Sequence, residues 1–137
     1  MANALYDKGR EAFAKGDINW KASGGDTIKV ILVDTNDYTV DLANHDHLDD
    51  VPTAARVATA TMTLLDPTNG ICDANDVTFT SVTGDQCEAI IIYKDTGNAS
   101  TSPLIAYIDT ATGLPVTPNG GDIGITWDNG SNKIFKL

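Results

Sequence analysis

The residues best suited to bind a metal ion form one short cluster. His45, Asp46 and His47 are consecutive, and Asp49 and Asp50 follow them closely. On an extended segment the side chains at 45 and 47 point to the same side, and imidazole nitrogens with carboxylate oxygens are ligands for divalent cations. The chain has no third histidine, and acidic residues beside histidine are common on solvated surfaces. We therefore expect a surface loop and assign no metal ligand.

A second group of oxygen-bearing side chains lies in D-P-T-N-G-I-C-D-A-N-D, residues 66–76. Its members are Asp66, Asn69, Asp73, Asn75 and Asp76. Such clusters suit Ca²⁺, but the order differs from the EF-hand loop, because the glycine is misplaced and no glutamate closes the loop. Turns in which Asp and Asn accept hydrogen bonds from nearby backbone N–H groups account for the same residues. The segment is compatible with a calcium loop or with a structural turn.

The two cysteines, Cys72 and Cys87, do not have the C-x-x-C spacing and have no basic neighbour that would favour a thiolate. We predict two free thiols with a structural role. No G-x-S-x-G sequence and no glycine-rich phosphate loop follows a strand. The sequence therefore predicts no enzyme, no catalytic residue and no cofactor. A hydrolase or lyase on a jelly-roll scaffold is an alternative, for which His45 and His47 are the only starting points.

These residues belong to a chain of ordinary globular composition. Its 137 residues are 42% hydrophobic and 20% charged, which predicts a single domain over residues 1–137. The net charge of −10 disfavours binding to DNA, RNA or an anionic membrane, because like charges repel. No apolar run reaches the ~20 residues that span a bilayer, and the first residues lack the apolar stretch of a secretory signal. We expect synthesis in a cytoplasm.

The pattern of residues 4–15 predicts an amphipathic helix, the only one in the chain. Asn3 is the expected N-cap, and Gly16 is the expected residue after the helix end. The expected buried face consists of Leu5, Gly9, Ala12 and Phe13.

Runs of β-branched and aromatic residues predict strands from about residue 27 onward. The expected strands are residues 27–33, 56–65, 77–82, 87–94, 104–110, 122–127 and 133–137. The fourth and fifth form the centre, because three consecutive isoleucines from Ile90 indicate a strand buried on both faces. Asn129-Gly130 predicts a hairpin between the last two strands. The fold class is therefore mainly β, an antiparallel sandwich or barrel of about seven or eight short strands with one N-terminal helix.

Two longer segments connect these strands. We expect residues 34–50 to form an ordered loop with one helical turn before Pro52, because proline disfavours helix at the residue before it. Residues 111–121 contain two prolines and three glycines, which predicts a surface connection. Four large aromatic residues are expected in the core rather than on a ligand platform. They are Trp20, Tyr107, Trp127 and Phe135.

Four stretches of sequence are distinctive as strings although they carry no chemistry. They are M-A-N-A-L-Y-D-K-G-R-E-A-F, Y-K-D-T-G, L-I-A-Y-I-D-T-A-T-G-L-P-V-T-P-N-G-G-D-I and T-W-D-N-G-S-N-K-I-F-K-L. Together they resemble a family of small structural proteins of tailed-bacteriophage virions. The resemblance runs from the first residue to the last and is less distinct over residues 23–83.

The resemblance implies a structural component of a virion, without catalytic residues. Within that class it favours a capsid cement or decoration protein on the outside of the shell, which binds the major capsid protein, bridges capsomers and forms a homotrimer. A tail or baseplate protein, structural or glycan-binding, is the alternative. The N-terminal helix then either packs on its own sheet or docks on a partner through Leu5, Tyr6 and Phe13.

Overall fold

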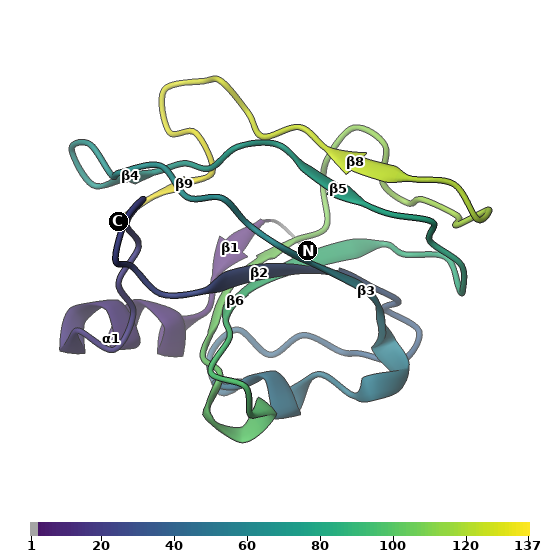
Figure 1. Ribbon diagram of the computed structural model, residues 1–137. Coiled ribbons are helices and arrows are strands. Elements are labelled where there is room, and N and C mark those ends of the chain that lie inside the picture. The colour runs from purple at the N-terminus through teal and green to yellow at the C-terminus, as the bar shows by residue number, and fades with distance from the viewer. Residues whose placement is uncertain (1–2) are drawn as a thin grey trace.

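The computed structural model describes residues 3–137 and confirms the mainly β, antiparallel fold (Figure 1). Its strands are β1 (Ala4–Leu5), β2 (Ile28–Val33), β3 (Arg56–Thr61), β4 (Ile71–Cys72), β5 (Val77–Phe79), β6 (Ala89–Lys94), β7 (Leu104–Ile108), β8 (Ile123–Ile125) and β9 (Phe135–Lys136). Its helices are α1 (Asp7–Lys15) and three single 3₁₀ turns, η1 (Leu48–Asp50), η2 (Thr53–Ala55) and η3 (Ala99–Thr101). The strands do not close into a barrel.

A five-stranded sheet with the order β1-β7-β6-β2-β3 forms the middle of the molecule. Strand β6 is central, as expected, and pairs with β2 on one side and β7 on the other. Its isoleucines alternate between the two faces of the sheet, and all three are buried. Ile90 and Ile92 belong to one core cluster, and Ile91 belongs to the other. The prediction of a strand covered on both faces is confirmed.

The two faces of the sheet are covered by different structures (Figure 1). On one face lie two short ribbons, β4 with β9 and β5 with β8, and the larger core cluster fills the space beneath them. On the other face lie the loop of residues 34–55 and η3, over the smaller cluster. Arg56 holds this loop, because its Nε donates to the carbonyl of Val51 at 2.8 Å and its Nη2 donates to that of Leu48 at 2.9 Å.

The helix α1 begins later than the sequence pattern suggests. Ala4 and Leu5 form β1 instead and pair with the edge of β7. The predicted cap, Asn3, has another role, since its Oδ1 accepts hydrogen bonds from the N–H groups of Asp109 and Thr110 at 3.0 Å. Pairing of Ala4 and Leu5 with β7 thus takes the place of the expected first turn of the helix. The predicted end is confirmed, because Gly16 is left-handed at φ 81°.

The predicted hairpin through residues 129–130 is wrong. Strand β8 pairs with β5, and β9 pairs with β4, so the last two strands belong to different ribbons. Trp127 separates them: its backbone N–H donates to Asp76 Oδ1 at 3.0 Å, and its indole N–H donates to the carbonyl of Asn75 at 3.1 Å. These bonds and the burial of the indole hold this part of the chain beside the residues that precede β5, so β8 does not pair with β9.

Most other expectations hold within a few residues. The helical turn before Pro52 is η1, and the four aromatic side chains expected in the core are all buried. Several predicted strands are shorter than expected. The strand at 77–82 ends at Phe79, because Ser81 has a φ of 50° that extended backbone does not allow. The described residues form nine strands rather than the seven expected, because β1 and β4 were not predicted.

Gly9 provides a test of how α1 packs on β7. A Cβ atom at this position would lie 2.6 Å from the carbonyl oxygen of Leu104, a backbone atom that cannot rotate away. Gly→Ala in an exposed helix usually stabilises by about 1 kcal/mol. Here we expect Gly9→Ala to lower the free energy of unfolding by about 1–3 kcal/mol, because the helix must move off the sheet. Urea denaturation measures the change.

The matched control is Ala14→Gly, at an exposed position of the same helix. It should cost about 1 kcal/mol through helix propensity alone. A Gly9→Ala protein that is more stable than the wild type would contradict the close packing of α1 on β7.

Candidate functional site

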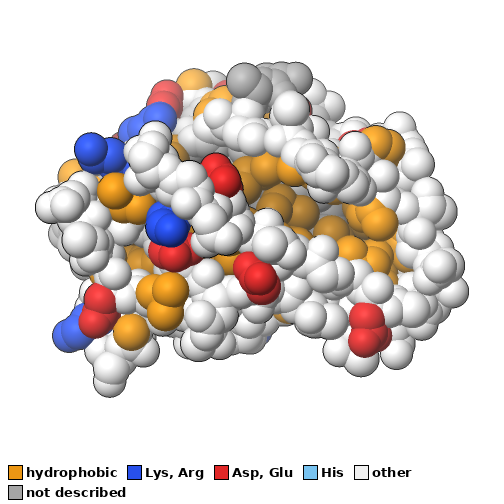
Figure 2. Space-filling view, turned by 90° about the horizontal axis from the view of Figure 1, so that it is seen from above, with side chains coloured by type: hydrophobic (Ala, Val, Ile, Leu, Met, Phe, Trp, Pro, Cys, Tyr) orange, Lys and Arg blue, Asp and Glu red, His pale blue; other side chains and the backbone are white. Residues whose placement is uncertain are grey.

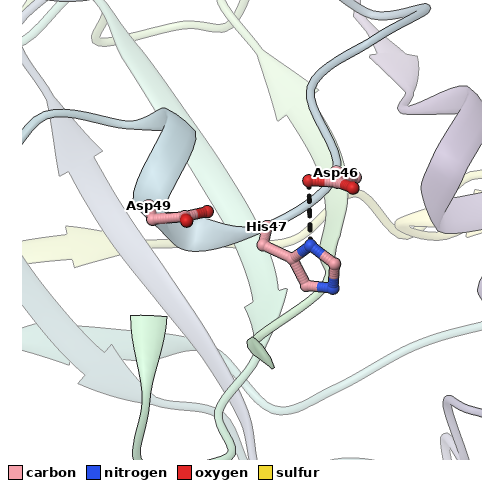
Figure 3. A group of neighbouring side chains, drawn as sticks. All are labelled: Asp46, His47 and Asp49. Atoms are coloured by element: carbon pink, nitrogen blue, oxygen red, sulfur yellow. Dashed lines mark ion pairs between the residues drawn. The ribbon is translucent and has the colours of Figure 1, made fainter. Parts of the chain in front are cut away.

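His47 lies in a small cluster with Asp46 and Asp49 (Figure 3), in which one ligand atom of each residue lies within 4.8 Å of the others. His47 Nδ1 is 2.8 Å from Asp46 Oδ1, so this nitrogen is already engaged. The carboxylate of Asp50 accepts a hydrogen bond from the backbone N–H of Asp46 at 2.8 Å. Asp46 and His47 are thus in contact at the start of the capped turn η1, and Asp49 lies near this pair.

His45 does not join His47, although the sequence places them two residues apart. Its Nδ1 accepts a hydrogen bond from the backbone N–H of Asp41 at 3.2 Å and lies 2.8 Å from the hydroxyl of Tyr38. The Tyr38 hydroxyl lies 2.9 Å from that of Tyr6, which is fully buried. His45 is thus the end of a hydrogen-bonded chain that anchors the loop of residues 34–50. The two side chains have separate partners, and His45 is not part of the cluster of Asp46, His47 and Asp49.

The direction of these hydrogen bonds follows from the chemistry of the groups. Burial raises the pKa of Tyr38 to about 12 and holds the pKa of Tyr6 far above its ordinary value, so both hydroxyls keep their protons. His45 Nδ1 accepts from a backbone N–H, so it has no proton to donate to Tyr38. The Tyr38 hydroxyl therefore donates to His45 Nδ1, and the Tyr6 hydroxyl donates to Tyr38.

The oxygen-rich segment of residues 66–76 forms a turn at Asn69-Gly70 followed by strand β4, and its carboxylates bind backbone groups. Asp66 Oδ1 accepts from the N–H of Ala22, and Asp76 Oδ1 accepts from that of Trp127. Asp73 Oδ1 accepts from the next residue along the chain. Each of these carboxylates accepts a hydrogen bond from a different backbone N–H group. Within residues 3–137 they do not gather at a common point.

A third acidic group, Asp34, Asp37 and Asp85, forms only in the folded chain. The buried carboxylate of Asp34 accepts from the N–H of Asn36 at 2.9 Å, which is the bond of a turn. This group was not predicted from the sequence, because Asp85 is about fifty residues away from the other two. Its one buried member has a hydrogen-bonding role in the fold, and the group carries no further sign of a ligand.

Both cysteines are free and buried, as predicted. Burial raises the pKa of the Cys72 thiol to about 11. Burial, together with the charge of Glu88, raises the pKa of the Cys87 thiol to about 11 as well. A thiol with so high a pKa is a poor nucleophile at neutral pH.

The residues proposed for partner docking are mostly not available to a partner. Tyr6 is 0% exposed and Leu5 is 8% exposed, and both pack in the protein's own core. Phe13 is half-buried and lies 6.1 Å from Phe135, measured between ring centroids. Leu5, in the edge strand β1, and Tyr6, directly after it, pack on the protein's own sheet, which is the other arrangement expected for this end of the chain.

A large hollow of the surface is a cleft between β8 and the chain that follows β7. It consists of two adjoining cavities of about 590 Å³ and 500 Å³. One wall is the continuous run of residues 122–128, and the opposite wall is formed mainly by residues 110–114. Ile90 and Leu32 of the central sheet lie at its floor. Figure 2 shows such a hollow with hydrophobic side chains on its floor.

The cleft was not predicted from the sequence. Residues 111–121 were expected to be a simple connection and residues 122–127 to be half of a hairpin. One sign was present in the sequence: Gly124 interrupts the strand between Ile123 and Ile125, and a glycine inside a strand often marks a close approach of another backbone.

The tryptophans do not form a platform for a glycan. Trp20 and Trp127 are buried, and each indole N–H donates to a backbone carbonyl at 3.1 Å.

None of the helices within residues 3–137 is long and apolar enough to cross a membrane. No protein-family model matches the chain, and no curated protein matches it significantly.

The chain of hydroxyls from Tyr6 to His45 predicts an asymmetric result. Tyr38→Phe should lower the free energy of unfolding by about 1–3 kcal/mol, because it leaves the buried Tyr6 hydroxyl without an acceptor. Tyr6→Phe should cost only about 0.5–1.5 kcal/mol, because Tyr38 still donates to His45. Urea denaturation of both variants tests this order. Equal losses, or a larger loss for Tyr6→Phe, would contradict the direction of the hydrogen bonds.

The raised pKa values of the thiols predict slow chemical modification. At pH 8 a thiol with a pKa near 11 is thiolate in only about one molecule in a thousand. We expect neither Cys72 nor Cys87 to react with Ellman's reagent within minutes in the native protein. Both should react at once in guanidinium chloride, which serves as the control. A thiol that reacts rapidly in the native state would show that its burial is wrong.

Proposed function

We propose that this chain is a non-enzymatic structural protein of a tailed-bacteriophage virion, a cement protein that binds the outer face of the capsid and bridges neighbouring capsomers. Its partners are the major capsid protein and further copies of itself in a homotrimer.

One observation carries the proposal. Three of the four stretches of sequence that resemble small virion proteins are far apart in the chain, but they meet around the cleft. Asn3 from the first stretch, residues 110–114 from the third, and Trp127 and Lys133 from the last all line it. A shared surface built from the resembling stretches is what a common binding partner requires.

The chemistry of the side chains favours a structural role. The groups best suited to catalysis serve the fold instead: the thiols have raised pKa values, His45 accepts from a backbone N–H, and His47 is paired with Asp46. The net charge of −10 suits the outside of a shell better than the side that faces packaged DNA, because phosphates repel it.

A cement role also has a thermodynamic basis. A protein that binds only the assembled lattice stabilises it by mass action. Bridging across a joint adds buried area where internal pressure tends to separate capsomers. The central sheet of this protein is packed on both faces. A closely packed body of this kind transmits such a load without deforming.

The test mixes the purified protein with capsids that lack it. We expect saturable binding, at a stoichiometry commensurate with the capsid lattice, and a higher melting temperature of the shell. Capsids that already carry the protein are the control and should bind little more. Absence of binding would reject the capsid assignment, and isolated tails would then be tested in the same way.

A further inference from the structure

The cleft has the shape of a missing strand. Strand β8 is an edge strand, because it pairs with β5 on one side and no strand among residues 3–137 pairs with its other side. Edge strands present N–H and C=O groups to which another extended chain can bind. The wall of residues 122–128 is seven residues long, or about 20 Å when extended. Within it, β8 spans Ile123–Ile125, so its free edge can pair with about three residues of an added strand while the rest of the segment lies along the wall.

The floor of the cleft is apolar, and its walls carry both apolar and polar side chains. Six apolar side chains that line it are only half-buried, so they keep surface that a partner can cover: Ile108, Leu114, Val116, Ile123, Ile125 and Ile134. Beneath them lies the well-packed side chain of Ile90. At the middle of β8, Gly124 has no side chain, and a Cβ there would meet only the carbonyl of Val77, at 3.9 Å. A second backbone can therefore approach β8 closely.

The rim of the cleft is acidic. Asp122 and Asp128 stand at the two ends of the long wall, and Lys133 is the one basic residue among the described residues that line the cleft. On this face of the molecule acidic side chains lie around the hollow, whereas most basic side chains gather at another end (Figure 2). Four of the other lysines, at positions 8, 15, 29 and 94, lie within 4.0 Å of carboxylates. The uncompensated charge beside the cleft is negative.

We propose that this cleft binds an extended segment of a partner protein, which adds a strand to the free edge of β8. The segment alternates apolar side chains, which fill the cleft, with lysine or arginine, which face Asp122 and Asp128. The cleft itself supports this, and such a segment would fit whether the partner belongs to a capsid or to a tail.

The proposal can be tested with peptides in place of the partner. A library of random linear 12-residue peptides is selected on the immobilised protein, and the enriched peptides are synthesised and titrated against it. We expect apolar residues in alternation with Lys or Arg. Thr112→Trp, which fills the cleft from an exposed position, should weaken their binding at least tenfold. The control Thr53→Trp, in η2 on the opposite face of the sheet, should change it less than twofold.

The charge requirement is tested separately. Asp122→Asn with Asp128→Asn keeps the side-chain oxygens that accept from the N–H groups of Ser81 and Gly130, so the fold should be unchanged. The double variant should bind the basic peptides several-fold more weakly at low salt, with a smaller dependence on salt concentration. If Thr112→Trp lowers the melting temperature, Ala111→Trp from the same exposed segment replaces it.

Several results would overturn the proposal. Enriched peptides that bind Thr112→Trp as tightly as the wild type, or enriched peptides that are acidic, would do so. A dimer in light scattering that Thr112→Trp dissociates would show that a second copy of the chain occupies the cleft. A small molecule retained by the purified protein in native mass spectrometry, and lost in Thr112→Trp, would show a ligand pocket instead.

Discussion

The burial of β6 on both faces is the constraint on which the rest of the structure depends. Its isoleucines supply one core cluster on each side of the sheet, so neither face can be left to water without a large loss of hydrophobic stabilisation. The strand also pairs on both edges, with β2 and β7. Every other element either extends this sheet or covers one of its faces.

The two covers differ in how they are held. The loop of residues 34–55 is fixed by directional polar contacts, from Tyr6 through Tyr38 to His45 and from Arg56 to two backbone carbonyls. The two ribbons on the other face are held mainly by apolar contacts, including Trp20 against Phe135 with centroids 5.2 Å apart. Because the ribbons are short and separate, they leave the cleft beside β8 uncovered.

Polar side chains in this protein mostly serve the backbone. Asp66, Asp76 and Asp122 each accept a hydrogen bond from an N–H group that is distant in sequence, and so they connect segments that the sheet does not connect. Carboxylates used in this way stabilise turns and ribbon ends. The acidic composition is therefore partly structural, and its excess gives the rim of the cleft its charge.

The sequence by itself determined what depends on local pattern. The three isoleucines from Ile90 indicate a doubly buried strand, Gly16 marks the end of α1, and isolated cysteines indicate free thiols, because each depends on a residue and its neighbours. Only the tertiary structure decided which strands pair, since β8 and β9 find partners about forty-five to sixty-five residues away rather than each other. It also turned Ala4 and Leu5 from helix to strand and separated His45 from His47. The cleft belongs to this second class, because its walls come from segments that meet only in the folded chain.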